Sequence, residues 1–169
     1  MPNHITNILT VQGGQEEIDA CLAYIVGEKD EDGHQRLIDF DKIIPAPKHI
    51  FMGNLSSVDE ERRGKKHCWY DWSIYNWGTK WNAYQISRDG NVVRFDTAWN
   101  MPDPIFRELS ALFPNLTFHV DYADEDIGSN CGTCVYQNGE PPVRIEPESP
   151  RKFALQVKGR DDRDDREAA

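Results

Sequence analysis

The most informative feature of this sequence is a tight turn that separates two runs of residues with strand character. The turn is RDGN, residues 88–91, in which Asp-Gly tolerates the positive φ values of a primed hairpin turn. After it, Val93 and Phe95 alternate with polar residues, and a period of two is typical of a strand with one buried face. We therefore predict an antiparallel hairpin in which residues 81–86 pair with residues 91–98.

The clearest helix of the sequence is predicted soon after this hairpin. In PDPIFRELSALFP, residues 102–114, Asp103 can cap the helix, Pro104 suits its first turn and Pro114 prevents its continuation. The apolar residues of this segment that recur at helical spacing are Ile105, Leu109 and Leu112. They are predicted to form the buried stripe of the helix.

The same periodicities predict further elements on both sides of this unit. They are strands at 4–11, 37–45, 116–122 and 131–137, a helix at 16–25 that Gly27 closes as a left-handed cap, a short polar helix at 55–66 and a turn at Asn138-Gly139. This order predicts an α+β fold, a ferredoxin-like sandwich with an antiparallel or mixed sheet and helices packed on one face. Residues 1–146 are predicted to form this single domain. Residues 147–169, rich in charge and proline, are predicted to be a flexible tail.

The segment CWYDWSIYNWGTKWNAYQI, residues 68–86, is unusually rich in tryptophan. We predict a helix at 69–77 that Gly78 ends, followed by a strand at 80–86, with one continuous strand as the alternative. The aromatic residues have two interpretations: they form the core of the sandwich, or they form the walls of a pocket that holds a ligand. The residues that would line this pocket are Trp72, Asn76, Trp77, Lys80, Trp81 and Trp99.

Several strings in this sequence resemble a known family. WYDWSIYNWGTKWNAYQI, VRFDTAW, ITNILTVQG and IDFDKIIPAP are similar to segments of the YubB-like family of phage- and plasmid-encoded proteins of unknown function. The resemblance covers residues 3–140 and implies a ferredoxin-like domain, a name that describes the fold and no iron–sulfur cluster. It also implies an origin in a mobile genetic element. It implies no activity, so no catalytic residue is carried over.

The chain is acidic, with 29 Asp and Glu residues against 19 Lys and Arg residues and a net charge of −10. Such a body repels phosphate backbones and anionic membranes, so neither nucleic acid nor a membrane is an expected partner. A basic cluster at residues 62–67, followed by Trp69 and Tyr70, keeps single-stranded nucleic acid as a weaker alternative. No apolar run approaches the ~20 residues that span a bilayer, and the N-terminus lacks a secretory signal, so we expect a cytoplasmic protein in a host cell.

Two of the four cysteines, Cys131 and Cys134, have the spacing of half a zinc site or of a redox pair. A structural zinc ion needs four ligands, and the sequence offers no second pair. A redox pair normally begins a helix, and no helix is predicted after Cys134. We therefore expect no metal and no cofactor, with these two residues as the only weak metal candidates.

The sequence contains no Ser/His/Asp arrangement, no P-loop and no dinucleotide-binding motif. We therefore predict a non-enzymatic accessory protein that contacts a host or phage protein through an acidic surface, with counter-defence as one role. The acidic loop at 121–126 is one part of that surface. The alternative is a small ligand- or nucleic-acid-binding module, or an enzyme, with a Trp-lined pocket.

Overall fold

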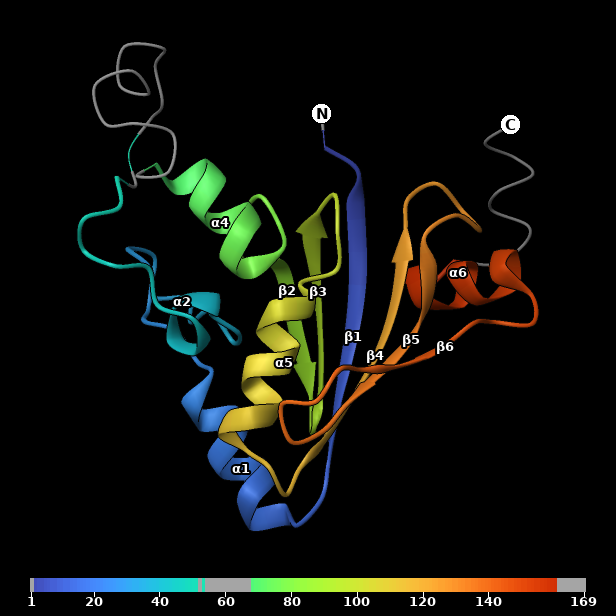
Figure 1. The fold of residues 1–169 in the computed structure, drawn as a ribbon, viewed down its shortest axis with the longest axis horizontal. Helices are drawn as coiled ribbons and strands as arrows, with labels where there is room; N and C mark the ends of the chain where they lie inside the picture. The colour runs from blue at the N-terminus through green and yellow to red at the C-terminus, as the bar shows by residue number, and fades with distance from the viewer. Residues whose placement is uncertain (1, 52, 54–67, 161–169) are drawn as a thin grey trace.

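The computed structural model describes residues 2–51, 53 and 68–160 (Figure 1). The strands are β1 (His4–Gln12), β2 (Tyr84–Asp89), β3 (Val92–Ala98), β4 (Thr117–Asp124), β5 (Cys131–Tyr136) and β6 (Val143–Ile145). The helices are α1 (Gln15–Tyr24), α2 (Phe40–Ile43), α4 (Trp69–Trp77), α5 (Asp103–Leu112) and α6 (Pro150–Lys158). The helix predicted at 55–66 and the basic cluster at 62–67 lie outside the described residues.

The strands form one antiparallel sheet in the order β2-β3-β1-β4-β5-β6. Within it, the succession β1-α1-β2-β3-α5-β4 places β1 between β3 and β4, which is the ferredoxin-like arrangement. Strands β5 and β6 extend the sheet beyond β4. The predicted fold class is confirmed.

The main core lies between the sheet and the helices α1, α2, α4 and α5, which cover the same face (Figure 1). Leu9 of β1 pairs with Val93 of β3 on one side and with Val120 of β4 on the other, and all three side chains are fully buried. Burial of an apolar side chain of this size contributes about 1.5–3 kcal/mol to the stability of the fold. The face of the sheet that carries these side chains is therefore the face that the helices cover.

The predicted hairpin is present, with a shorter first strand. Strand β2 begins at Tyr84, three residues later than the predicted start, and the register shifts between Tyr84 and Ser87. The turn is formed by Gly90 and Asn91, and Gly90 adopts a φ of 58°. Glycine at the first central position with a positive φ is the arrangement of a type II′ turn, so the turn is primed as predicted. Its central residues are Gly90 and Asn91 rather than the predicted Asp89 and Gly90, because Asp89 still pairs with Val92 in the strands.

The Trp-rich segment begins with a helix, as predicted, and the continuous strand is wrong. Helix α4 ends at Gly78, which has a φ of 76° and donates its N–H to the carbonyl of Ile74. A Cβ at this position would lie 2.8 Å from Cδ of Pro104, so a side chain here would clash with α5 as well as strain the backbone.

The strand predicted at 37–45 is wrong, because this segment contains the short helix α2. Asp39 caps it: the carboxylate accepts a hydrogen bond of 3.0 Å from the backbone N–H of Asp41. Phe40 and Ile43, three residues apart, are then both buried in the main core. The apolar run is too short for its periodicity to distinguish a strand from a helical turn.

The flexible tail predicted at 147–169 is wrong for residues 150–158, which form α6. Pro150 occupies the first turn of this helix, where backbone N–H groups have no partner within the helix, so the lack of an N–H in proline costs no hydrogen bond. Ala154 and Val157, which α6 buries, pack against Ala123 and Cys131 on the face of the sheet opposite the main core (Figure 1). Proline in this segment is typical of disorder, but Pro150 instead marks the start of a helix.

Three details of the predicted helix ends and stripes are also wrong. Helix α1 ends at Tyr24 with Ile25 as its cap, so Gly27 lies beyond it. Asp103 is the first residue of α5 and Pro102 is its cap residue. Leu112, predicted to be buried, is exposed at the end of that helix.

Candidate functional site

The structure divides the six predicted pocket residues into two groups. Trp72 and Trp77 lie on the inner side of α4 and are buried, with their rings in an edge-to-face contact at 5.2 Å. The indole N–H of Trp77 donates a hydrogen bond of 2.9 Å to the carbonyl of Ile44. Asn76 donates to the carbonyl of Trp72 in its own helix. Trp72 and Trp77 therefore pack in the core, and Trp77 also lines two of the pockets described below.

The other three predicted residues meet at the surface. Lys80 lies over the rings of Trp81, Trp99 and Tyr70, with its Nζ 4.6 Å, 5.0 Å and 5.7 Å from the respective ring centroids. We call these four residues the Lys80 cluster. The indoles of Trp81 and Trp99 are 38% and 36% exposed. An ammonium group over aromatic faces at these distances is a cation–π arrangement.

Trp99 reaches this cluster through a strained turn. Its φ is 71°, and the N–H of Asn100 donates to the carbonyl of Ala98, which are the features of a γ-turn centred on Trp99. The N–H of Trp99 and the hydroxyl of Thr79 hold this turn in place, by hydrogen bonds to the carbonyls of Asn3 and Ala98. Such a backbone conformation costs about 1–3 kcal/mol in a residue other than glycine.

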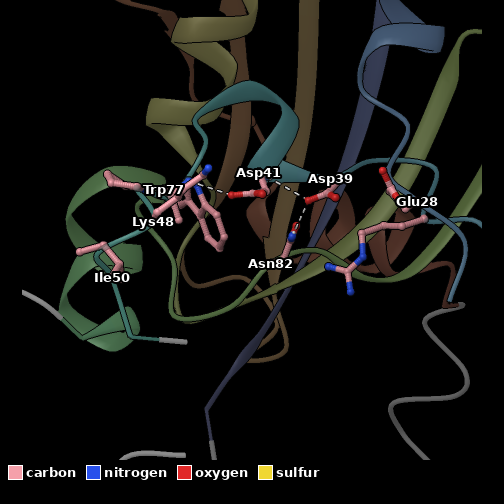
Figure 2. A pocket seen from close by; sticks show the side chains of 10 residues that line it. Glu28, Asp39, Asp41, Lys48, Ile50, Trp77 and Asn82 are labelled. Carbon is pink, nitrogen blue, oxygen red and sulfur yellow. Dashed lines mark hydrogen bonds between the residues drawn. The ribbon is translucent and has the colours of Figure 1, made fainter. Parts of the chain in front are cut away.

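A pocket of about 480 Å³ with charged residues of both signs is lined in part by Trp77 (Figure 2). Its lining residues are Glu28, Arg36, Asp39, Asp41, Ala46, Pro47, Lys48, Ile50, Trp77 and Asn82. Figure 2 shows Asp39 bonded to Asn82, at 2.7 Å, with Trp77 and Lys48 farther along the wall. Asp39 also caps α2, and Asp41 accepts from the N–H of Ala46 at 2.8 Å. The carboxylates in the middle of the pocket therefore already organise the loop around it.

The exposed carboxylates are concentrated in α1 and in the turn that follows it. Between residues 15 and 32 the only basic residue is Lys29. We call the exposed carboxylates of this stretch the acidic strip: Glu16, Glu17, Asp19, Glu28, Asp30, Glu31 and Asp32. Seven exposed carboxylates thus stand against one lysine in this stretch.

The loop at 121–126, predicted as acidic surface, has mixed roles. Asp124 is buried, and its carboxylate accepts hydrogen bonds from Asn3, Asn130 and the N–H of Asp126. Only Glu125 and Asp126 are exposed here. The buried carboxylate holds the loop in shape, so this loop offers a partner less charge than its sequence suggested.

Among the described residues, Asp30, Asp32 and His34 bring potential metal-ligand atoms within 4.8 Å of one another. All three residues are exposed, and the Asp30 carboxylate accepts a hydrogen bond from the N–H of His34. The group is thus part of the turn that carries the acidic strip.

Sequence reasoning missed a polar pocket of about 280 Å³ beside α6. Its lining residues are His4, Thr6, Gln85, Arg94, Asp96, Glu125, Lys158 and Arg160. His4 Nδ1 lies 2.6 Å from the hydroxyl of Tyr84, and Lys158 donates to the His4 carbonyl at 2.8 Å. Burial lowers the pKa of Lys158, and burial together with nearby carboxylates raises the pKa of Tyr84 to about 12. This pocket depends on α6, which the sequence predicts as part of a flexible tail, so the sequence does not indicate the pocket.

Cys131 and Cys134 point to opposite faces of β5, because side chains three residues apart on a strand alternate. Cys131 packs under α6, whereas Cys134 belongs to the main core, where Arg144 approaches its sulfur at 3.5 Å. Burial raises the pKa of both thiols. The two sulfur atoms therefore do not converge on one metal ion.

In the described part of the chain, no helix has the length and apolarity to cross a membrane.

Comparisons with known proteins identify a family. A family model described as the ferredoxin-like domain in Api92-like protein matches residues 76–164, more than half of the chain. Among solved structures, a crystal structure of protein Api92 from Yersinia pseudotuberculosis is similar, at 21% sequence identity and a TM-score of 0.36. The alignment covers 47% of this chain and 31% of that chain, so the chain spans about a third of that protein's length. No curated protein matches the chain.

The match runs from the last turn of α4 through the whole of α6, so α6 belongs to the domain. The ferredoxin-like fold implied by the sequence resemblance is confirmed, whereas the YubB-like name and the phage or plasmid origin stay predictions. The chain belongs to the family defined by the ferredoxin-like domain in Api92-like protein.

Proposed function

We propose that this protein binds a partner protein through its acidic surface and catalyses no reaction. The observation that supports this proposal is the acidic strip, where seven exposed carboxylates share one helix and one turn with a single lysine. Carboxylates gathered in one stretch produce a stronger local field than the same charges spread over the surface. The strip is therefore the part of the surface that a basic partner would approach.

The chemistry of the strip defines the kind of partner. A basic protein surface complements it, including one that normally holds nucleic acid, because exposed carboxylates can occupy the positions of phosphates. In this proposal the protein is an accessory protein of a phage or plasmid, the partner is a host or phage protein, and blocking a host defence is one outcome. Opposite charges accelerate such an association. Added salt slows it, because at physiological ionic strength the attraction between exposed charges is largely screened beyond ~8 Å.

The test is capture from a bacterial lysate, followed by binding kinetics with the purified captured protein. The strip variant is E28K/E31K/D32K, which leaves Asp30 in place because its carboxylate forms the turn. We expect the strip variant to lose capture and to slow association at least tenfold at low salt.

The matched control is E140K/E146K/E148K, which reverses three exposed carboxylates at the β5–β6 end of the molecule and changes the net charge equally. This control is expected to retain capture. If both variants lose capture equally, capture depends on net charge alone. If both variants retain capture, the acidic strip does not contact the partner. Either result contradicts the proposal.

A further inference from the structure

The Lys80 cluster supports an inference that is independent of the acidic strip. We infer that Tyr70, Trp81 and Trp99 form a binding cage for an alkylated ammonium group, and that Lys80 is its resident occupant in this structure. A ligand with that group would displace the Lys80 side chain and take its place between the rings.

The geometry fits a cation. The faces of aromatic rings are electronegative and attract an ammonium group within about 6 Å of the ring centroid, and all three rings meet this condition for Lys80. The rings come from separate parts of the chain: Tyr70 from α4, Trp81 from the segment before β2, and Trp99 from the γ-turn after β3. Tyr70 and Trp99 also contact each other edge to face at 6.2 Å, so two of the walls support one another.

The exposure of these rings distinguishes them from core residues. Trp72 and Trp77 in the same segment are buried, whereas Trp81 and Trp99 remain more than a third exposed beside the Lys80 ammonium. Within residues 2–51, 53 and 68–160, no carboxylate forms a salt bridge with Lys80. The aromatic faces are thus its main electrostatic partners in this region, and the strained turn at Trp99 holds one of them in place.

A hollow adjoins the cage on the side of Lys80 and Trp81, and it could take the methyl groups of a larger cation. The hollow has a volume of about 220 Å³ and is lined mainly by apolar surface from Trp69, Trp77 and Trp81. Methyl groups on a quaternary nitrogen would contact this apolar surface, and such a cation is less strongly hydrated than Lys80. The negative net charge of the protein also favours the approach of a cation.

An alkylated ammonium group can come from a small molecule or from a methylated lysine of another protein. Both are tested by titration of the full-length protein, with tryptophan fluorescence as the readout. The probes are tetramethylammonium chloride and a short peptide with one trimethyllysine, with sodium chloride as the ionic-strength control. Tighter binding of the peptide would identify a protein side chain as the source, and equal binding would identify the small cation.

The decisive variant is Lys80→Ala, which removes the resident cation and leaves the rings. We expect this variant to bind tetramethylammonium about two- to fivefold more tightly than the parent, because no internal occupant competes. Trp81→Leu should abolish binding. Tyr75→Ala, which removes an aromatic ring of α4 that is 87% exposed and lies outside the cluster, should change nothing.

The opposite sign for Lys80→Ala would overturn the inference. If this variant binds the cation no better, or if instead it loses binding of the anionic probe indole-3-acetate, Lys80 is a ligand-binding residue for anions and the cage is not a cation site. Absence of binding of either cationic probe to Lys80→Ala protein with a native circular dichroism spectrum would equally reject it.

Discussion

Trp72 and Trp77 differ from Trp81 and Trp99 in a way that their common residue type does not reveal. The first pair is buried, packs ring against ring, and satisfies the Trp77 indole N–H at a backbone carbonyl. The second pair lies beyond Gly78, where the chain leaves the helix, and its rings flank Lys80 at the surface. Within about thirty residues the same side chain thus supplies core volume and then exposed aromatic surface beside Lys80.

The largest expected difference between the two pairs is in stability. Trp77→Ala should lower the free energy of unfolding by about 3–5 kcal/mol, because it leaves a cavity next to Phe40 and an unpaired carbonyl at Ile44. Trp81→Ala should lower it by about 1 kcal/mol or less. Urea denaturation of both variants checks this. Equal losses would show that the surface pair is part of the core.

A smaller effect is expected at the boundary between the pairs. Gly78→Ala should lower the free energy of unfolding by about 1–3 kcal/mol, because it combines a positive φ with the contact at Pro104. Gly90→Ala is the matched control, since Gly90 also has a positive φ but has open space around it. In thermal denaturation, Gly78→Ala should have a lower melting temperature than Gly90→Ala. The reverse order would remove the contact with α5 from the account.

The pH dependence of stability should also separate the core from the surface cluster. Burial raises the pKa of Cys21 from 9.0 to about 12, so the folded state keeps a proton that the unfolded chain loses in this window. The free energy of unfolding should therefore fall as pH rises from 9 to 12. Tyr84 contributes in the same direction, and Lys158, with its lowered pKa, in the opposite one.

Chemical denaturation at a series of pH values measures this slope. Cys21→Ala should be less stable at pH 8 but should show a shallower fall above pH 9. Tyr75→Ala, which removes an exposed ring of α4, should keep the slope of the parent. An unchanged slope in Cys21→Ala would mean that its thiol does not titrate differently in the folded and unfolded states.

The smallest expected effect has the opposite sign. Trp99→Asn should leave the free energy of unfolding unchanged or raise it by up to about 1 kcal/mol, because asparagine tolerates the positive φ of the γ-turn better than tryptophan does. A loss of more than 2 kcal/mol in urea denaturation would assign Trp99 to the core rather than to the cage.

The parts of the fold that the sequence predicted correctly are those with a local signal. The alternation in β3, the turn at Gly90 and the stripe in α5 are each contained in a few neighbouring residues. Helix α2 is only four residues long, so its two apolar residues fit a strand pattern as well as a helical one. In α6 the apolar positions are few and surrounded by charge and proline, and only the packing against Ala123 and Cys131 explains why it folds.

The candidate site was predicted in part for the same reason. Lys80, Trp81 and Trp99 were identified from their residue types, but nothing in the sequence separated them from Trp72 and Trp77. That separation depends on the end of α4 at Gly78 and on a γ-turn at Trp99, where a tryptophan with positive φ is unusual. The polar pocket beside α6 joins residues 154 positions apart, His4 and Lys158, and no local pattern can indicate such a contact.

The most direct test of the division between core and surface tryptophans is NMR of protein labelled with 5-fluorotryptophan. Single Trp→Phe variants assign the five resonances. Titration of the Lys80→Ala protein with tetramethylammonium should shift the Trp81 and Trp99 signals most and leave in place that of Trp72, which does not line the hollow beside Lys80. Shifts confined to the buried pair, or shared equally by all four, would contradict the account.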